Sequence, residues 1–81
     1  EITVAERVEV CRSHLLAAVD FKGERTAVFE MRKHYGAYFK GLANFKPFRL
    51  ALCNAKTLQE VLDILNNLGN PDNHVYPSLA Q

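Results

Sequence analysis

The sequence has no tryptophan, one methionine, three prolines and two cysteines among its 81 residues. It contains no signal peptide and no run of the roughly 18 apolar residues that a membrane span needs. Cys11 and Cys53 are too few for the disulfide framework of a small secreted domain, so we expect both to be reduced thiols in helices. These absences favour a cytoplasmic protein with no membrane partner. Because the chain starts at Glu1 rather than Met, we expect it to be part of a longer protein.

The alternation of apolar and polar residues that marks a β-strand is also missing, and apolar residues recur at helical spacing instead. Thr3 and Glu6 form a capping box that opens a helix over about 4–21. Gly23 can take the left-handed conformation that ends this helix. A second helix is predicted over 25–41.

The second half of the chain predicts two further helices. Asn44 can cap a helix that has Pro47 in its first turn and ends at about Asn54. A second capping box over 57–60 opens the last helix, whose dense apolar face includes Leu65.

Together these elements predict an all-α fold, a small four-helix bundle with short connections over residues 1–69. The 48% hydrophobic content is ample for one core, but a chain of 81 residues leaves little room for an active-site cavity as well. Gly69 and Pro71 end the last helix. Residues 70–81 have no periodicity, so we expect an extended or disordered tail there.

Positive charge gathers in the middle of the chain. Residues 22–56 hold eight lysines and arginines and two acids, a net charge of +6, whereas residues 1–21 carry −2 and residues 57–81 carry −3. Such clustering, more than the nearly neutral total, is the electrostatic footprint of a surface that binds a polyphosphate.

The predicted second helix has two chemically different faces at about 100° per residue. The apolar face carries Ala27, Val28, Met31, Tyr35, Tyr38 and Leu42, and the opposite face carries Arg25, Arg32, Lys33 and Lys40. A merely solvated face usually mixes Glu with Lys four residues apart, and this basic stripe contains no acid. We therefore interpret the stripe as a contact for an anion. Gly36 lies between Arg32 and Lys40, which suits either a closely approaching phosphate or close helix packing.

Other side chains extend this candidate surface. His34 borders the stripe and can either donate to phosphate or cover the edge of the core. Tyr35, Tyr38 and Phe39 could stack on unpaired bases, but core packing is the favoured interpretation, and Phe39 lies nearest the edge. The predicted RNA-binding residues are Arg25, Arg32, Lys33, His34, Lys40, Lys46 and Arg49.

Cys11 and His14 stand one helical turn apart and could supply two metal ligands. Zinc sites need three or four protein ligands, and no second Cys/His pair at ligand spacing is present. Cys11 also lacks an evident base or orienting group for nucleophilic catalysis. The sequence predicts no metal, cofactor or catalytic residue in this chain, and hence no independent enzyme.

Several short motifs, Gly23, Met31-Arg32-Lys33-His34, Ala37-Tyr38 and Lys40-Gly41-Leu42, resemble the C-terminal helical domain of bacterial tRNA-dihydrouridine synthases. The resemblance extends over about residues 2–68. In that family an N-terminal barrel holds FMN and reduces selected tRNA uridines with NADPH, while the helical domain helps to hold the tRNA. The resemblance implies that Arg32, Lys33, His34 and Lys40 lie on the tRNA-facing helix. It also implies tRNA and the barrel of the parent chain as partners, with FMN and NADPH bound outside this chain.

An alternative function is a helical protein–protein interaction module that docks through an exposed apolar patch. Salt discriminates between the two hypotheses, because phosphate binding weakens steeply as salt rises, whereas apolar docking does not.

Overall fold

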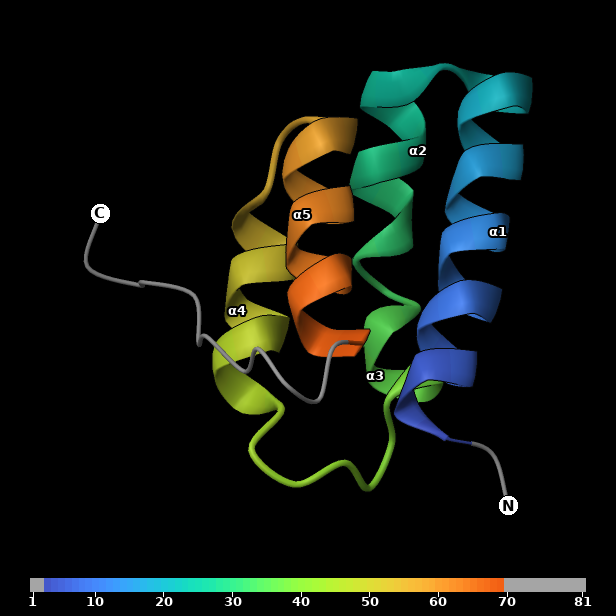
Figure 1. The fold of residues 1–81 in the computed structure, drawn as a ribbon. Helices are drawn as coiled ribbons and strands as arrows, with labels where there is room; N and C mark the ends of the chain where they lie inside the picture. The colour runs from blue at the N-terminus through green and yellow to red at the C-terminus, as the bar shows by residue number, and fades with distance from the viewer. Residues whose placement is uncertain (1–2, 70–81) are drawn as a thin grey trace.

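The computed structural model describes residues 3–69, and every regular element in that range is helical (Figure 1). In chain order the helices are α1 (Val4–Lys22), α2 (Glu24–Met31), α3 (Tyr35–Tyr38), α4 (Lys46–Asn54) and α5 (Leu58–Gly69). α1 and α2 lie side by side, and α5 packs against α1, α2 and α4. The all-α prediction is confirmed. The predicted four-helix bundle becomes, in this part of the chain, four longer helices and the one-turn α3.

The helices of the described range are all too short or too polar to cross a bilayer. The predicted tail over 70–81 lies outside the described residues. The predicted domain boundary after residue 69 therefore remains a prediction.

Local capping signals open the first and the last helix. Thr3 Oγ1 accepts from the Glu6 N–H at 3.1 Å, and Glu6 Oε1 accepts from the Thr3 N–H at 2.8 Å. Thr57 and Glu60 make the same exchange at 3.2 and 3.0 Å. Both predicted capping boxes are thus confirmed. Gly23 ends α1 as predicted, but its φ of 91° and ψ of 157° are an extended conformation open to glycine rather than the left-handed helical one.

The predicted continuous helix over 25–41 is wrong. α2 ends at Met31, a three-residue turn follows, and α3 begins at Tyr35. The turn is tightened by a bond from the His34 N–H to the Met31 carbonyl at 2.9 Å. In one straight helix, Met31, Tyr35 and Phe39 would each be rotated about 40° from the one before. The turn keeps all three side chains in the core, at 1%, 0% and 1% exposure.

The start of α4 also differs from the sequence prediction. Phe45, not Asn44, occupies the N-cap position, and no side chain caps this helix. Asn44 instead has a φ of 60°, in the left-handed region that Asn tolerates better than most residues. Pro47 lies in the first turn and α4 ends at Asn54, as predicted.

The core draws side chains from all five helices and from the α3–α4 connection. Tyr35 and Leu65 are fully buried, which confirms their predicted core positions. Phe39 is 1% exposed and its ring lies 5.0 Å from that of Phe45, so the suggested base-stacking role for Phe39 is wrong. Its packing partner comes from the connection that follows, which helical spacing within one element does not reveal.

Both cysteines are free thiols within helices, as predicted. Cys11 has no exposed surface, and burial raises the pKa of its thiol to about 12. Since the thiolate is the reactive form, Cys11 is an inert core residue at neutral pH. Cys53 is half-buried.

Candidate nucleic-acid interface

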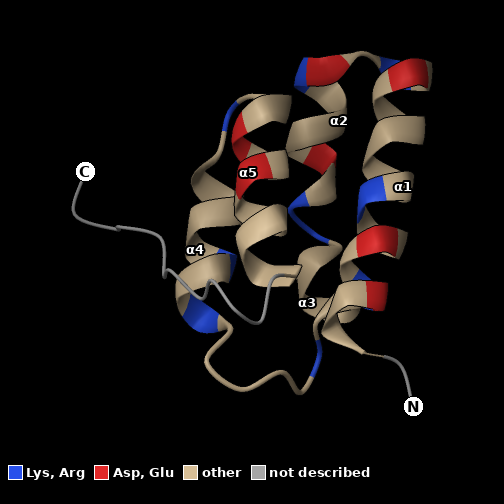
Figure 2. Cartoon of the chain, in the orientation of Figure 1, with Lys and Arg blue, Asp and Glu red and all other residues tan. Residues whose placement is uncertain are grey.

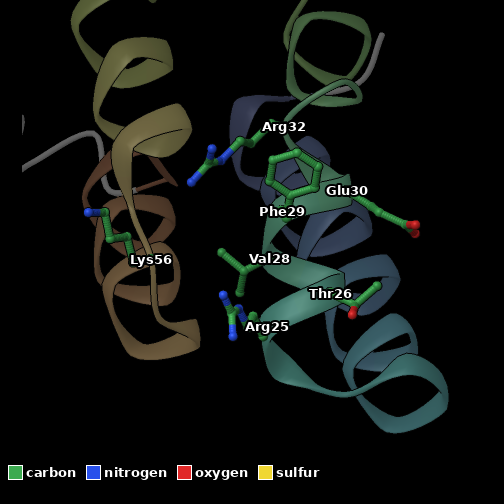
Figure 3. A pocket seen from close by; sticks show the side chains of 7 residues that line it. All are labelled: Arg25, Thr26, Val28, Phe29, Glu30, Arg32 and Lys56. Atoms are coloured by element: carbon green, nitrogen blue, oxygen red, sulfur yellow. The ribbon is translucent and has the colours of Figure 1, made fainter.

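A groove of about 520 Å³ lies between α2 and the α4–α5 connection (Figure 3). It is lined by Arg25, Thr26, Val28, Phe29, Glu30, Arg32 and Lys56. In Figure 3, Arg25, Val28 and Arg32 extend from α2 toward the segment that carries Lys56, while Glu30 points away from it. Lys56 also lines the groove, although its ammonium group points away from the two arginines in Figure 3. The groove therefore combines two arginines and a bordering lysine with an apolar surface supplied by the exposed Phe29 ring.

Arg32 is the best-anchored cation of the groove. One terminal nitrogen of its guanidinium donates to the Ala55 carbonyl at 3.3 Å. The guanidinium carbon also lies over the Phe29 ring, 5.2 Å from the ring centroid, a cation–π contact worth about 0.5–1 kcal/mol at an exposed site. The Nε atom of Arg32 is buried and has no hydrogen-bond partner among the described residues. Arg32 is thus held in place with part of its donor capacity unused.

Two hydrogen bonds tie the walls of the groove together. Arg32 reaches Ala55 at one end, and at the other the Glu24 carboxylate accepts from the Leu58 N–H at 2.9 Å. The Lys56 N–H donates to Glu60 Oε1 at 2.9 Å, which fixes the backbone beneath the Lys56 side chain. These bonds fix the backbone segments from which the cations of the groove extend.

Glu30, the acid that lines the groove, is already paired. Its carboxylate accepts from Lys22 Nζ at 2.5 Å, and this hydrogen bond and charge lower the pKa of the Glu30 carboxyl. The other acids of the described residues are Glu24 at the start of α2, which binds the Leu58 N–H, and those on α1 and α5, whereas the link from α2 to α3 and the start of α4 are basic (Figure 2). An anion that enters the groove therefore meets cations without an unpaired carboxylate on the lining.

The structure divides the predicted basic stripe. Arg25 and Arg32 share the groove, but Lys40 lies beside Arg7 and Tyr38 on the side of α1. The Lys40 carbonyl accepts from the Arg7 guanidinium at 2.9 Å. The break between α2 and α3 is the cause, because it changes the direction of the side chains that follow the turn, including Lys40.

His34 also leaves the groove side. It is half-buried, and its ring centroid lies 5.0 Å from that of His14 on α1. His14 Nδ1 in turn lies 2.6 Å from the Tyr38 hydroxyl. Of the two roles open to His34 from the sequence, covering the edge of the core agrees better with this position.

The remaining predicted contacts, Lys33, Lys46 and Arg49, are exposed. The guanidinium of Arg49 lies over Gly36, where an added Cβ would meet it at 3.8 Å. Of the two explanations that the sequence allowed for Gly36, close approach of a phosphate is therefore obstructed, because the Arg49 guanidinium already covers this position.

A family model described as dihydrouridine synthase (Dus) matches residues 1–72 of the chain. The chain belongs to the dihydrouridine synthase family. The resemblance seen in the motifs between Gly23 and Leu42 is thus confirmed at the level of the family. No solved structure matches this dihydrouridine synthase family chain.

Among the groove residues of this family member that were not predicted from the sequence are the aromatic Phe29 and the cation Lys56. A signal for Phe29 was present, because it stands four residues after Arg25 and three before Arg32, and such positions share a helix face. Lys56 carries no comparable signal. It reaches the groove only because the α4–α5 connection packs beside α2.

The family resemblance implies FMN as the cofactor of the parent enzyme. The described residues of this chain do not form a site that would fit FMN. A flavin ring needs a concave, mostly enclosed apolar site with a few convergent polar groups. The groove is instead an open surface feature whose aromatic side chain, Phe29, is 66% exposed. Within residues 3–69, no three His, Cys, Asp or Glu side chains gather as metal ligands either. The expectation that this chain holds no cofactor or metal remains a prediction.

Proposed function

We infer that this chain is a tRNA-holding helical domain of a flavin-dependent dihydrouridine synthase, and that the groove between α2 and the α4–α5 connection contacts the RNA backbone. The observation that supports this most is the meeting of Arg25, Arg32 and Lys56 along a groove whose single acid is paired elsewhere. Because the chain belongs to the dihydrouridine synthase family, the ligand that we propose for this groove is RNA.

The chemistry of these side chains suits phosphate. A guanidinium offers several donors in a fixed fork that matches two phosphate oxygens, and an ammonium adds a compact point charge. Contacts of this kind fix the position and register of a nucleic acid without reading its sequence. In this proposal the domain orients tRNA, and uridine selection depends on how the tRNA meets the catalytic part of the enzyme.

Reduction itself is assigned to another part of the parent protein. A barrel of the type that the resemblance implies needs roughly 250 residues, far more than this chain provides. FMN and NADPH would bind there, and the barrel would be the second partner of this domain. A cytoplasmic location, where tRNA is processed, belongs to the same proposal.

The exposed cations outside the groove form a second part of the proposal. Lys33, Lys46 and Arg49 are free to contact further phosphates along the RNA. His34 and Lys40 lie toward α1, so they would contribute only if the RNA also passes that side.

Titration of labelled tRNA at several salt concentrations tests the groove. The double variant Arg25→Gln with Lys56→Gln should bind more weakly and lower the slope of log K against log salt by about 0.7–0.9 per lost contact. The matched control, Arg7→Gln with Arg12→Gln, removes the same charge from α1 and should leave the slope unchanged. Equal effects of the two double variants would mean that the groove is not the RNA contact.

A specific observation keeps the protein-interaction alternative open. Val10 and Phe21 are 56% and 85% exposed on α1, and they lie close to one line along that helix. A partner that docks there would bind without marked salt dependence. If the chain ignores tRNA but binds a protein partner in high salt, and if Phe21→Ala abolishes that binding, this alternative replaces the first.

A further inference from the structure

Among the aromatic side chains of residues 3–69, Phe29 is the one that is both largely exposed to solvent and flanked by two arginines. Its ring is 66% exposed at the groove, although large apolar side chains usually find cover. Arg25 lies one turn before it on α2, and Arg32, the C-cap residue of that helix, sits over its ring.

Phe21 shows that exposure alone is not the argument. It is more exposed than Phe29, at 85%, and single exposed apolar residues are normal on protein surfaces. However, Phe21 follows Asp20, and the neighbouring Lys22 is paired with Glu30. The setting of Phe29 differs, because an aromatic ring in a cationic groove is the arrangement with which proteins bind single-stranded nucleic acid.

We propose that the groove is a subsite for one unpaired nucleotide, with its base stacked on Phe29 and its flanking phosphates held by Arg25 and Lys56. This inference rests on the proposed tRNA-binding function and deepens it. The groove of about 520 Å³ is an open surface feature in which the Phe29 ring is 66% exposed. A base on the exposed surface of the ring would extend the stack that Arg32 has begun on Phe29.

The subsite selects an unpaired nucleotide rather than a particular base. Stacking accepts every base, because each has an aromatic face. No Asn or Gln side chain lines the groove, and its polar side chains are the three cations, Thr26 and the paired Glu30. A base inside a duplex is already stacked on both sides, so it cannot stack on Phe29 without leaving the helix.

The experiment compares oligouridylate with a fully paired RNA duplex of equal length. Phe29→Ala should weaken oligouridylate binding about tenfold, the loss expected when one base–aromatic stack is removed. It should weaken duplex binding by no more than the few-fold loss expected when Arg32 loses its contact with the ring. The matched control is Phe21→Ala, which removes a more exposed ring outside the groove and should change neither.

A fluorescence variant gives an independent readout. Because the chain has no tryptophan, Phe29→Trp introduces a single reporter in the groove. Its emission should be quenched when oligouridylate binds, whereas Phe21→Trp should be insensitive. Both positions are exposed, so neither substitution threatens folding.

The outcomes separate this inference from the function on which it rests. If Phe29→Ala binds oligouridylate as tightly as the parent chain and Phe29→Trp is not quenched, the stacking subsite is wrong. Salt-dependent tRNA binding that persists in the same Phe29→Ala chain would leave the proposed function intact. If the parent chain binds neither tRNA nor oligouridylate, the function and the subsite fail together.

Discussion

The two sides of α2 differ in burial and, in our proposal, in role: one stabilises the fold and the other binds RNA. On the core side, Ala27 and Met31 are 0% and 1% exposed, and Met31 packs into the common hydrophobic cluster. On the groove side, Phe29 is 66% exposed and Arg25 faces solvent. A substitution on the core side should therefore change the free energy of unfolding. One on the groove side should change RNA affinity while the fold remains.

The strongest test of this division is Met31→Ala. Removal of a buried Met side chain should lower the free energy of unfolding by about 2–5 kcal/mol, a large fraction of a small domain's stability. Leu65→Ala, which removes another fully buried side chain from the same cluster, should cost a similar amount. Urea unfolding followed by circular dichroism measures both.

The matched groove-side variant is Phe29→Ala. Because Phe29 is exposed and its main contact is with Arg32, the substitution should lower the free energy of unfolding by no more than about 1 kcal/mol. A loss for Phe29→Ala as large as that for Met31→Ala would show that the two sides of α2 are not separable.

Glu24→Gln tests whether the walls of the groove are held together by the fold. The variant should weaken the bond to the Leu58 N–H, which also satisfies an amide in the first turn of α5. We expect a loss of about 1 kcal/mol in the free energy of unfolding, in the range of a helix cap. Unchanged stability would mean that the α2–α5 tie is not maintained in solution.

Arg32→Lys tests anchoring separately from charge. Lysine keeps the positive charge but loses the fork that reaches Ala55 while lying over Phe29. Affinity for tRNA should fall severalfold, corresponding to about 0.5–1 kcal/mol, the size of the cation–π contact. The salt slope should not change, because the number of cations is the same. A changed slope with unchanged affinity would contradict the anchoring role.

Some of the contacts that these tests address can be predicted from the sequence, and others cannot. α1 and α5 were predictable because their capping boxes lie within four consecutive residues, Thr3–Glu6 and Thr57–Glu60. The break after Met31 was not, since it is stabilised by burial of Tyr35 and Phe39 and by the bond from Arg32 to a carbonyl 23 residues away. Periodicity within a segment carries no information about such contacts.

In the candidate site too, residues placed by local spacing were predictable and residues placed by long-range packing were not. Arg25 and Arg32 could be predicted from their place on the charged face, and the spacing of Phe29 would have added it. Lys40 was misplaced because its direction depends on the turn before α3. Lys56 became part of the site only through the packing of the α4–α5 connection beside α2.

The smallest expected effect is a pH dependence at the start of α5, next to Lys56. Hydrogen bonds from the Lys56 and Thr57 backbone amides and from the Thr57 hydroxyl lower the pKa of the Glu60 carboxyl in the folded chain. A carboxyl whose folded pKa lies below its unfolded value adds stability above the unfolded pKa, near 4.3, and loses it as pH falls through the folded pKa. Glu60→Gln should therefore lower Tm at pH 7 and cause little change in strong acid, so the difference between the two Tm curves should close below about pH 4. A difference that stayed constant through the acid range would mean that the Glu60 charge does not contribute to this cap.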